Sequence, residues 1–133
     1  MYDVMSITKA AIGIMYKVSK KQMLDMVGWE EDFDYDDFRK QVAEKADLKA
    51  YAKSRMKKST GFSYCNLAYQ ILACDMPDVP RRFGKFIDRP VRRRDNHWFY
   101  GDGWKWEHCN GQPLGPHGLF LTQEVGKIFG EKA

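Results

Sequence analysis

The chain has 133 residues, of which 44% are hydrophobic, 14% aromatic and 30% charged, and its formal net charge is +4. This length suits one domain, and the aromatic content argues against intrinsic disorder. No apolar run approaches the roughly 20 residues of a membrane helix, and the N-terminus lacks a signal-peptide layout. We therefore expect a single cytoplasmic domain (residues 1–133) that does not insert into a membrane.

The N-terminal segment has the pattern of an amphipathic helix that starts near Asp3. Its hydrophobic residues recur at three- and four-residue steps, at Val4, Ile7, Ala11, Ile14 and Val18. Ser19 and Gln22 have the spacing of a capping box, which predicts a second short helix over residues 20–27. Gly28 stands where a left-handed residue would close that helix.

Residues 12–19 resemble the first helix and the turn of a helix-turn-helix motif, although Lys17 stands where that motif usually has glycine. The resemblance implies that side chains at the start of the second helix reach phosphates and base edges. The candidate nucleic-acid-binding residues there are Lys20, Lys21 and Gln22. The alternative interpretation is an ordinary helical hairpin that contributes to the core.

An acidic run, residues 30–37, carries six acidic side chains and no basic one. Carboxylates stabilise the first turn of a helix, because they interact favourably with its unpaired N–H groups and its dipole. The run therefore predicts a helix from about Tyr35 to a break at Ser59. The hydrophobic side of this helix would consist of Phe38, Val42, Ala46 and Ala50.

Residues 62–74 predict another buried helix, which Ser63 would cap and which Pro77 and Pro80 would stop. With this helix, the first part of the chain contains three to four helices. We therefore expect a helical half of about residues 1–75.

The three cysteines are odd in number and have no CxxC spacing, so free thiols are expected rather than a disulfide framework. Cys65, Cys74, Cys109, His108 and His117 are residue types that bind zinc, but their spacing matches no zinc pattern. We expect no metal site and no cofactor.

Cys65 would lie in the first turn of its helix, where a lowered thiol pKa makes a nucleophile. His97, His108 and His117 are candidates for the catalytic base. The order of cysteine and then histidine is similar to that in cysteine hydrolases of the NlpC/P60 type, although the Asp-Cys-Ser-Gly context of that family is missing here. A cysteine hydrolase is therefore one alternative function, and the competing interpretation is a buried cysteine that serves as a small hydrophobic side chain.

The second half of the chain, about residues 76–133, is basic and rich in aromatic residues. Residues 98–100 and 104–106 predict two strands joined by a glycine-containing loop of about three residues. A closing helix around Leu121–Phe129, or a strand over residues 118–122, would dock on this aromatic hairpin. The predicted fold class is therefore α+β, with a helical N-terminal half and a C-terminal aromatic hairpin.

Residues 81–94 contain seven basic side chains and one acidic one, which gives this basic run a net charge of +6. Guanidinium groups match phosphate oxygens, and aromatic rings stack on bases. The candidate nucleic-acid or anion-binding residues of this half are Arg81, Arg82, Lys85, Arg89, Arg92, Arg93, Arg94, Trp98, Trp104 and Trp106.

Two arrangements of charge are open: the acidic and basic runs pair with each other, or they lie on separate faces and the basic run attracts phosphate. We expect the second. The leading expectation is a small non-catalytic regulatory or accessory protein that binds DNA or RNA. The alternative partner is a larger protein, such as a host enzyme that a small viral or mobile-element protein modulates, because Trp, Tyr and Arg dominate interface hot spots. No GxGxxG, P-loop, HExxH or EF-hand spacing occurs, which removes the common nucleotide, zinc-peptidase and calcium functions.

Overall fold

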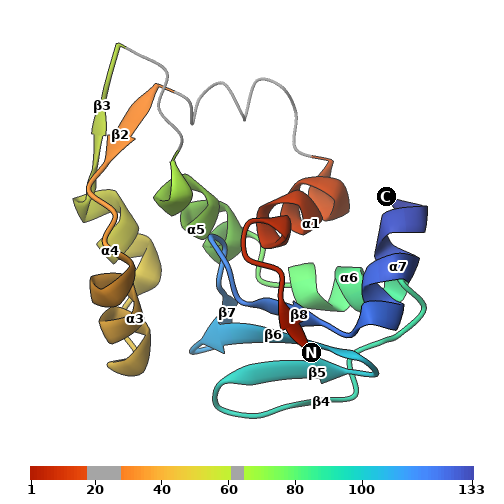
Figure 1. Ribbon diagram of the computed structural model, residues 1–133. Helices are drawn as coiled ribbons and strands as arrows, with labels where there is room; N and C mark the ends of the chain where they lie inside the picture. The colour runs from red at the N-terminus through yellow and green to blue at the C-terminus, as the bar shows by residue number, and fades with distance from the viewer. Residues whose placement is uncertain (18–27, 61–64) are drawn as a thin grey trace.

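The computed structural model describes residues 1–17, 28–60 and 65–133, and it shows the expected α+β fold (Figure 1). Its main sheet is antiparallel. The strands lie in the order β1 (Tyr2–Asp3), β8 (Leu119–Leu121), β6 (Trp104–Cys109), β5 (Trp98–Gly101) and β4 (Arg93–Arg94). The short strand β7 (Gln112–Pro113) pairs with the end of β6, and β2 (Trp29–Glu31) pairs with β3 (Met56–Lys58) in a separate ribbon.

Three helices cover one face of the main sheet (Figure 1): α1 (Ile7–Tyr16), α6 (Val79–Phe86) and α7 (Gln123–Lys132). Beside the sheet lie α3 (Tyr35–Ala43) and α4 (Leu48–Ser54), and α5 (Asn66–Asp75) packs between them and α1. Among the segments that the structure describes, no helix has the length and apolarity needed to cross a bilayer.

The first core lies between the main sheet and its covering helices. Trp104 and Trp106 are fully buried there, and the ring of Phe83 from α6 meets both edge-on, with ring centroids 5.2 and 5.7 Å apart. Each indole N–H has an acceptor: Trp104 donates to the carbonyl of Arg89 (2.7 Å) and Trp106 to that of Leu114 (3.0 Å). Buried tryptophans with satisfied N–H groups contribute large apolar areas without a desolvation penalty.

The second core joins α3, α4 and α5. Phe38, Leu48, Ala52 and Leu67 are fully buried in it. α5 connects the two cores, because its Leu72 side chain belongs to the first. The described residues therefore form two adjoining hydrophobic clusters with α5 shared between them.

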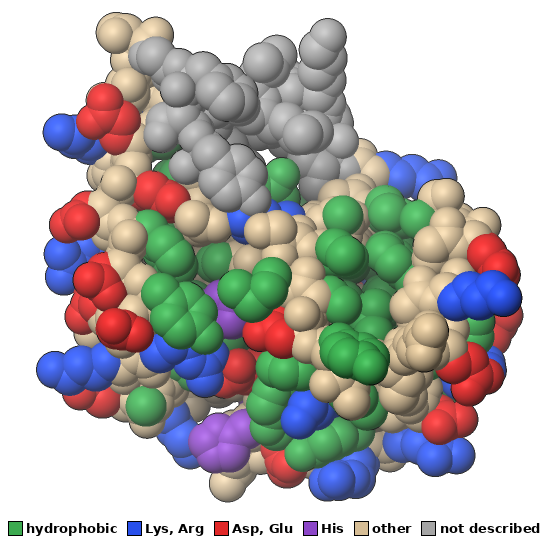
Figure 2. All heavy atoms as spheres, in the orientation of Figure 1, with side chains coloured by type: hydrophobic (Ala, Val, Ile, Leu, Met, Phe, Trp, Pro, Cys, Tyr) green, Lys and Arg blue, Asp and Glu red, His purple; other side chains and the backbone are tan. Residues whose placement is uncertain are grey.

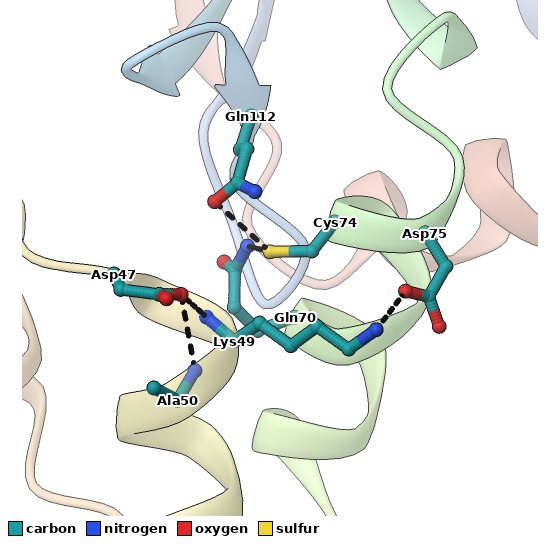
Figure 3. Close-up of polar contacts among 7 residues, drawn as sticks. All are labelled: Asp47, Lys49, Ala50, Gln70, Cys74, Asp75 and Gln112. Carbon is teal, nitrogen blue, oxygen red and sulfur yellow. Dashed lines mark hydrogen bonds and ion pairs between the residues drawn. The ribbon is translucent and has the colours of Figure 1, made fainter.

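Polar contacts fix α4 against α5 and β7 (Figure 3). The carboxylate of Asp47 caps α4 by accepting from the backbone N–H groups of the second and third residues of that helix, both at 3.1 Å. Lys49 forms an ion pair with Asp75 at the end of α5. The Cys74 thiol lies between two amides: the Gln70 amide nitrogen donates to its sulfur (3.4 Å), and the thiol donates to Gln112 (3.5 Å).

The first helix starts later than the sequence pattern predicts. Tyr2 and Asp3 form β1 by pairing with β8, and the Asp3 carboxylate accepts from the N–H of Met5, so the helix begins only at Ile7. Its buried side includes Ala11 as expected, whereas Ile7 is 48% exposed. The error arose because the partner of β1 lies more than 100 residues away in the sequence.

Lys17 ends α1 in the left-handed conformation, with φ 47° and ψ 51°. This is the conformation that glycine favours, so the substitution that weakened the helix-turn-helix resemblance does not prevent the turn. Lys20, Lys21 and Gln22, the capping box and the second helix over residues 20–27 lie outside the described residues.

The single helix predicted from Tyr35 to Ser59 is instead two helices and a strand. α3 begins as expected after the acidic run, because Asp34 caps it by accepting from the N–H of Asp37 (3.0 Å). The chain then turns at Lys45, where φ is +55°, and starts again at Asp47. The prediction failed because the hydrophobic spacing of a helix continues across this turn.

The second half agrees more closely with its prediction. The aromatic hairpin is present, although its loop has two residues, Asp102 and Gly103, rather than three. The closing strand and the closing helix both form, as β8 and α7, and β8 pairs with β6 of the hairpin. The helix α5 ends at Asp75, before Pro77 as expected, whereas Pro80 occupies the first turn of α6, where a missing N–H costs nothing.

Candidate nucleic-acid interface

The main sheet has a second face, opposite α1, α6 and α7. Side chains alternate between the two faces along a strand, and the strand register places Tyr100 opposite Lys105, Lys105 opposite Phe120, and Trp98 opposite Glu107. Arg93 on β4 is opposite Tyr100. Asp3 on β1 is opposite Phe120. We call this surface the open face and define it by Asp3, Arg93, Trp98, Tyr100, Lys105, Glu107 and Phe120. In Figure 2, hydrophobic side chains gather around a basic one in the lower middle of the molecule, with charged side chains along the bottom edge.

Lysine and arginine lie against the rings of the open face. The Lys105 ammonium is 4.2 Å from the ring centroid of Trp98 and 5.1 Å from that of Phe120. These two rings meet edge-on, with centroids 5.4 Å apart and an angle of 80° between their planes. The Arg93 guanidinium lies 3.8 Å from the ring centroid of Tyr100. Such cation–π contacts stabilise a half-exposed site by about 0.5–2 kcal/mol each, and here they place positive charge on an aromatic surface.

Asp95 fixes the start of β5 at the edge of the open face. Its carboxylate accepts from the backbone N–H groups of His97 and Trp98, both at 2.8 Å. The hydrogen bond from His97 is the main reason that the pKa of Asp95 lies below its usual value. Arg93 pairs with the same carboxylate at 3.9 Å. Asp95 therefore remains charged near neutral pH and anchors the backbone that carries Trp98.

An ion pair between buried Glu107 and half-buried Arg39 closes one end of the open face. Glu107 is only 7% exposed, and its two carboxylate oxygens accept from Arg39 of α3 at 2.8 and 2.7 Å. The hydrogen bond to Glu107 is the main cause of a raised pKa of Arg39. This bidentate geometry neutralises the charge of Glu107.

His117 completes this end of the site. Its Nε2 lies 3.4 Å from the Arg39 guanidinium, and its ring contacts those of Tyr35 and Phe38 at centroid distances of 5.2 and 5.5 Å. Burial, and then the charge of Arg39, lower the pKa of His117. The imidazole is therefore neutral near pH 7 and packs α3 against the sheet.

The structure gives no support to a nucleophilic Cys65. Its thiol donates to the Glu31 carboxylate (3.4 Å), which also accepts from Asn66 (2.9 Å) and from the N–H of Leu67 (2.8 Å). Glu31, and not a thiolate, thus occupies the N-terminus of α5. Burial raises the pKa of Cys65 to about 11, so the lowering expected at a helix start does not occur. His117, one of the suggested bases, contacts Arg39 and two aromatic rings instead.

All three cysteines are free and buried, and burial also raises the pKa values of Cys74 and Cys109. Within residues 1–17, 28–60 and 65–133, no group of three or more His, Cys, Asp or Glu side chains is placed to hold a metal ion.

Two of the predicted aromatic site residues are wrong. Trp104 and Trp106 are fully buried in the first core, where Phe83 and the helices cover them, so neither ring can stack on a base. Trp98 does lie on the open face, and its ring partner there is Phe120. The open face instead contains three side chains that were not among the predicted site residues, namely Tyr100, Lys105 and Phe120.

The basic run is divided between the two sides of the sheet. On the helical side, Arg82 of α6 stacks over Tyr16 at 4.5 Å and pairs with Asp78, and Arg89 forms ion pairs at 3.9 and 3.6 Å with acids after β5 and on α7. Arg94 lies 5.5 Å from the ring centroid of Phe99, on the core side of β4. Arg81, Lys85 and Arg92 are also exposed.

The acidic run forms ion pairs with basic residues that lie outside the basic run. Asp32 and Asp37 lie 3.3 and 3.5 Å from the guanidinium of Arg55, and Glu30 pairs with Lys57 across the β2–β3 ribbon. Local bases beside α3 and α4 thus neutralise much of this run. None of these three contacts joins the acidic run to the basic run.

The fold and the open face together define an α+β protein with a one-sided helical layer and an aromatic, basic sheet surface on the other side. Comparison with known proteins gives no match: no family model fits the chain, and no curated protein or solved structure is similar to it.

Proposed function

We propose that this protein binds nucleic acid through the open face and the adjoining arginine edge, as a small non-catalytic regulatory or accessory protein of the cytoplasm. One observation carries the proposal: Trp98, Tyr100 and Phe120 share the sheet face opposite the helices, and Lys105 and Arg93 lie against their rings. Free thiols agree with a reducing compartment.

The physical argument combines two contributions. An aromatic ring that stacks on a base contributes roughly 1 to 3 kcal/mol, and the contribution depends little on the identity of the base. Cations beside the rings neutralise phosphates and release counterions. Arg92 and Arg93 are exposed at the edge where a backbone leaving the open face would pass. The pairing of Glu107 with Arg39 removes the repulsion that an unpaired carboxylate would exert on phosphate.

The test is the salt dependence of binding to fluorescently labelled nucleic acids, measured by anisotropy. Replacing Arg92 and Arg93 by Gln should lower the slope of log affinity against log salt concentration by about 1 to 2, since each phosphate contact contributes about 0.7 to 0.9. Arg94 is left unchanged because it packs on Phe99.

The matched control replaces Lys40 and Lys53, which are exposed on α3 and α4, and has the same change in net charge. The control should keep the wild-type slope. If neither variant changes the slope, or if the wild type binds no nucleic acid at low salt, the proposed function is wrong.

A protein partner is the second candidate, because a different surface favours it. Large hydrophobic side chains at the N-terminus and at the start of α3 are 47% to 70% exposed: Met1, Tyr2, Met5, Ile7 and Tyr35. Four of them lie within the first seven residues, and apolar groups that gather into one exposed patch mark protein contacts. In this case a protein captured from nuclease-treated lysate by the wild type would be lost in a Tyr2→Ser, Ile7→Ser double variant, while nucleic-acid affinity would not change.

A further inference from the structure

The rings of the open face are arranged as two neighbouring platforms. Trp98 and Phe120 form one with their edge-on contact, and Tyr100 forms the other. Trp98 and Tyr100 are two residues apart on β5, which separates their Cα atoms by about 6.5 Å along the strand. Two aromatic platforms side by side on one face of the sheet suit two successive unpaired bases.

From this arrangement we infer that the open face binds single-stranded nucleic acid, with unpaired bases stacked on the Trp98–Phe120 and Tyr100 platforms. The inference rests on the proposed function and adds the class of ligand. In a duplex the flat faces of the bases are covered by neighbouring base pairs, and only base edges are accessible in the grooves. A single strand can turn its bases outward onto aromatic side chains.

The position of the rings within the sheet also favours a single strand over a duplex. A protein element that reads a duplex is an α-helix or a two-stranded ribbon narrow enough to enter the major groove. The rings here lie on the middle strands β5 and β8, with β6 between them. Rings in the middle of a sheet cannot enter the major groove of a duplex. An extended single strand, in contrast, can lie across the sheet and contact these rings.

Lys105 has a specific part in this arrangement. Its ammonium group lies between the Trp98 and Phe120 rings and is the cation at the centre of the open face. The side chain is flexible, so it leaves the rings when a base stacks there and pairs with the phosphate of that nucleotide. Arg93 has the corresponding position beside Tyr100 at the edge of the sheet. Both cations therefore give the aromatic surface a positive charge. When a single strand binds, they contact its phosphates.

The experiment compares three probes of equal length at about 150 mM salt: a labelled single strand of 10 uridines, a 10-unit abasic strand with the same phosphates, and a duplex of 10 base pairs. The single strand should bind at least tenfold more tightly than the other two, because it alone offers free base faces. Trp98→Ala should weaken its binding by roughly 5- to 150-fold, the span that one stacked base contributes.

Trp98→Phe keeps a ring and serves as the matched variant, which should retain most of the affinity. Thermal unfolding of each variant shows whether its fold is intact, and Phe120→Leu provides a second test of the same platform. Binding of the duplex as tightly as the single strand, or equal binding of the abasic strand, would overturn the inference and leave the proposed function standing. The same holds if both platform variants fold and bind normally. Failure of all three probes at low salt would overturn both.

Discussion

At the residue scale, Cys65 illustrates how a structural environment removes a reactive function. A cysteine at the start of a helix is a common nucleophile because the helix dipole favours the thiolate. Here Glu31 accepts the hydrogen bonds at that end of α5 and the thiol is buried, and burial raises the pKa of Cys65 to about 11. The carboxylate disfavours a second negative charge beside it.

The residue-scale prediction concerns the alkylation of Cys65. The pKa of Cys65 is raised from a reference value of 9.0 to about 11, so its thiolate fraction near pH 7.5 is about 100-fold lower than that of a thiol with the reference value. Iodoacetamide should therefore modify Cys65 about 100-fold more slowly than a short cysteine peptide, with the rate at each site followed by mass spectrometry. A rate equal to or faster than that of the peptide would contradict this account and would favour a cysteine hydrolase.

At the element scale, the sequence predicts well where local signals decide and poorly where distant strands decide. The start of α3 follows from Asp34 and the carboxylates beside it, and the hairpin follows from alternating aromatic residues around a glycine turn. β1 has two residues and no pattern of its own, so its pairing with β8 could not be predicted. The turn at Lys45 was also missed, because a left-handed lysine has no sequence signature.

The element-scale prediction compares the same substitution at two glycines. A Cβ at Gly115 would collide with the backbone carbonyl of Tyr69 in α5, which cannot move away without shifting the helix. A Cβ at Gly126 in α7 meets nothing within 4 Å. Gly115→Ala should lower the free energy of unfolding by about 3 kcal/mol, whereas Gly126→Ala should raise it by about 0.5–1 kcal/mol, since alanine favours a helix.

Urea denaturation of the two variants measures both changes. Equal effects of the two substitutions, or a stable Gly115→Ala variant, would show that α5 and the loop after β7 are not packed as tightly as described.

At the scale of the whole molecule, the site depends on which side chains face the helices. A three-residue loop in the hairpin would pair Trp98 with Trp106 and place all the tryptophans of the hairpin on one face. The two-residue loop pairs Trp98 with Glu107 instead, so Trp104 and Trp106 turn to the core and Trp98 stays outside. A difference of one residue in register exchanges the faces of a strand.

The rest of the site was beyond sequence reasoning for the same reason. Phe120 joins Trp98 only because β8 pairs with β6, and Arg39 reaches Glu107 across 68 residues of sequence. The alternation in Leu119–Leu121 was a signal that placed Phe120 opposite the two leucines. It could not show which side the helices would cover, because that depends on the packing of the whole chain.

The central claim is that nucleic acid contacts the open face, and photocrosslinking tests its location most directly. A single-stranded RNA that contains 4-thiouridine would be irradiated with the protein, and the crosslinked peptides would be identified by mass spectrometry. The account predicts crosslinks to the strands of the open face, at Trp98, Tyr100 or Phe120. Crosslinks confined to α6 on the helical side or to other segments, or no crosslinks under conditions of binding, would contradict it.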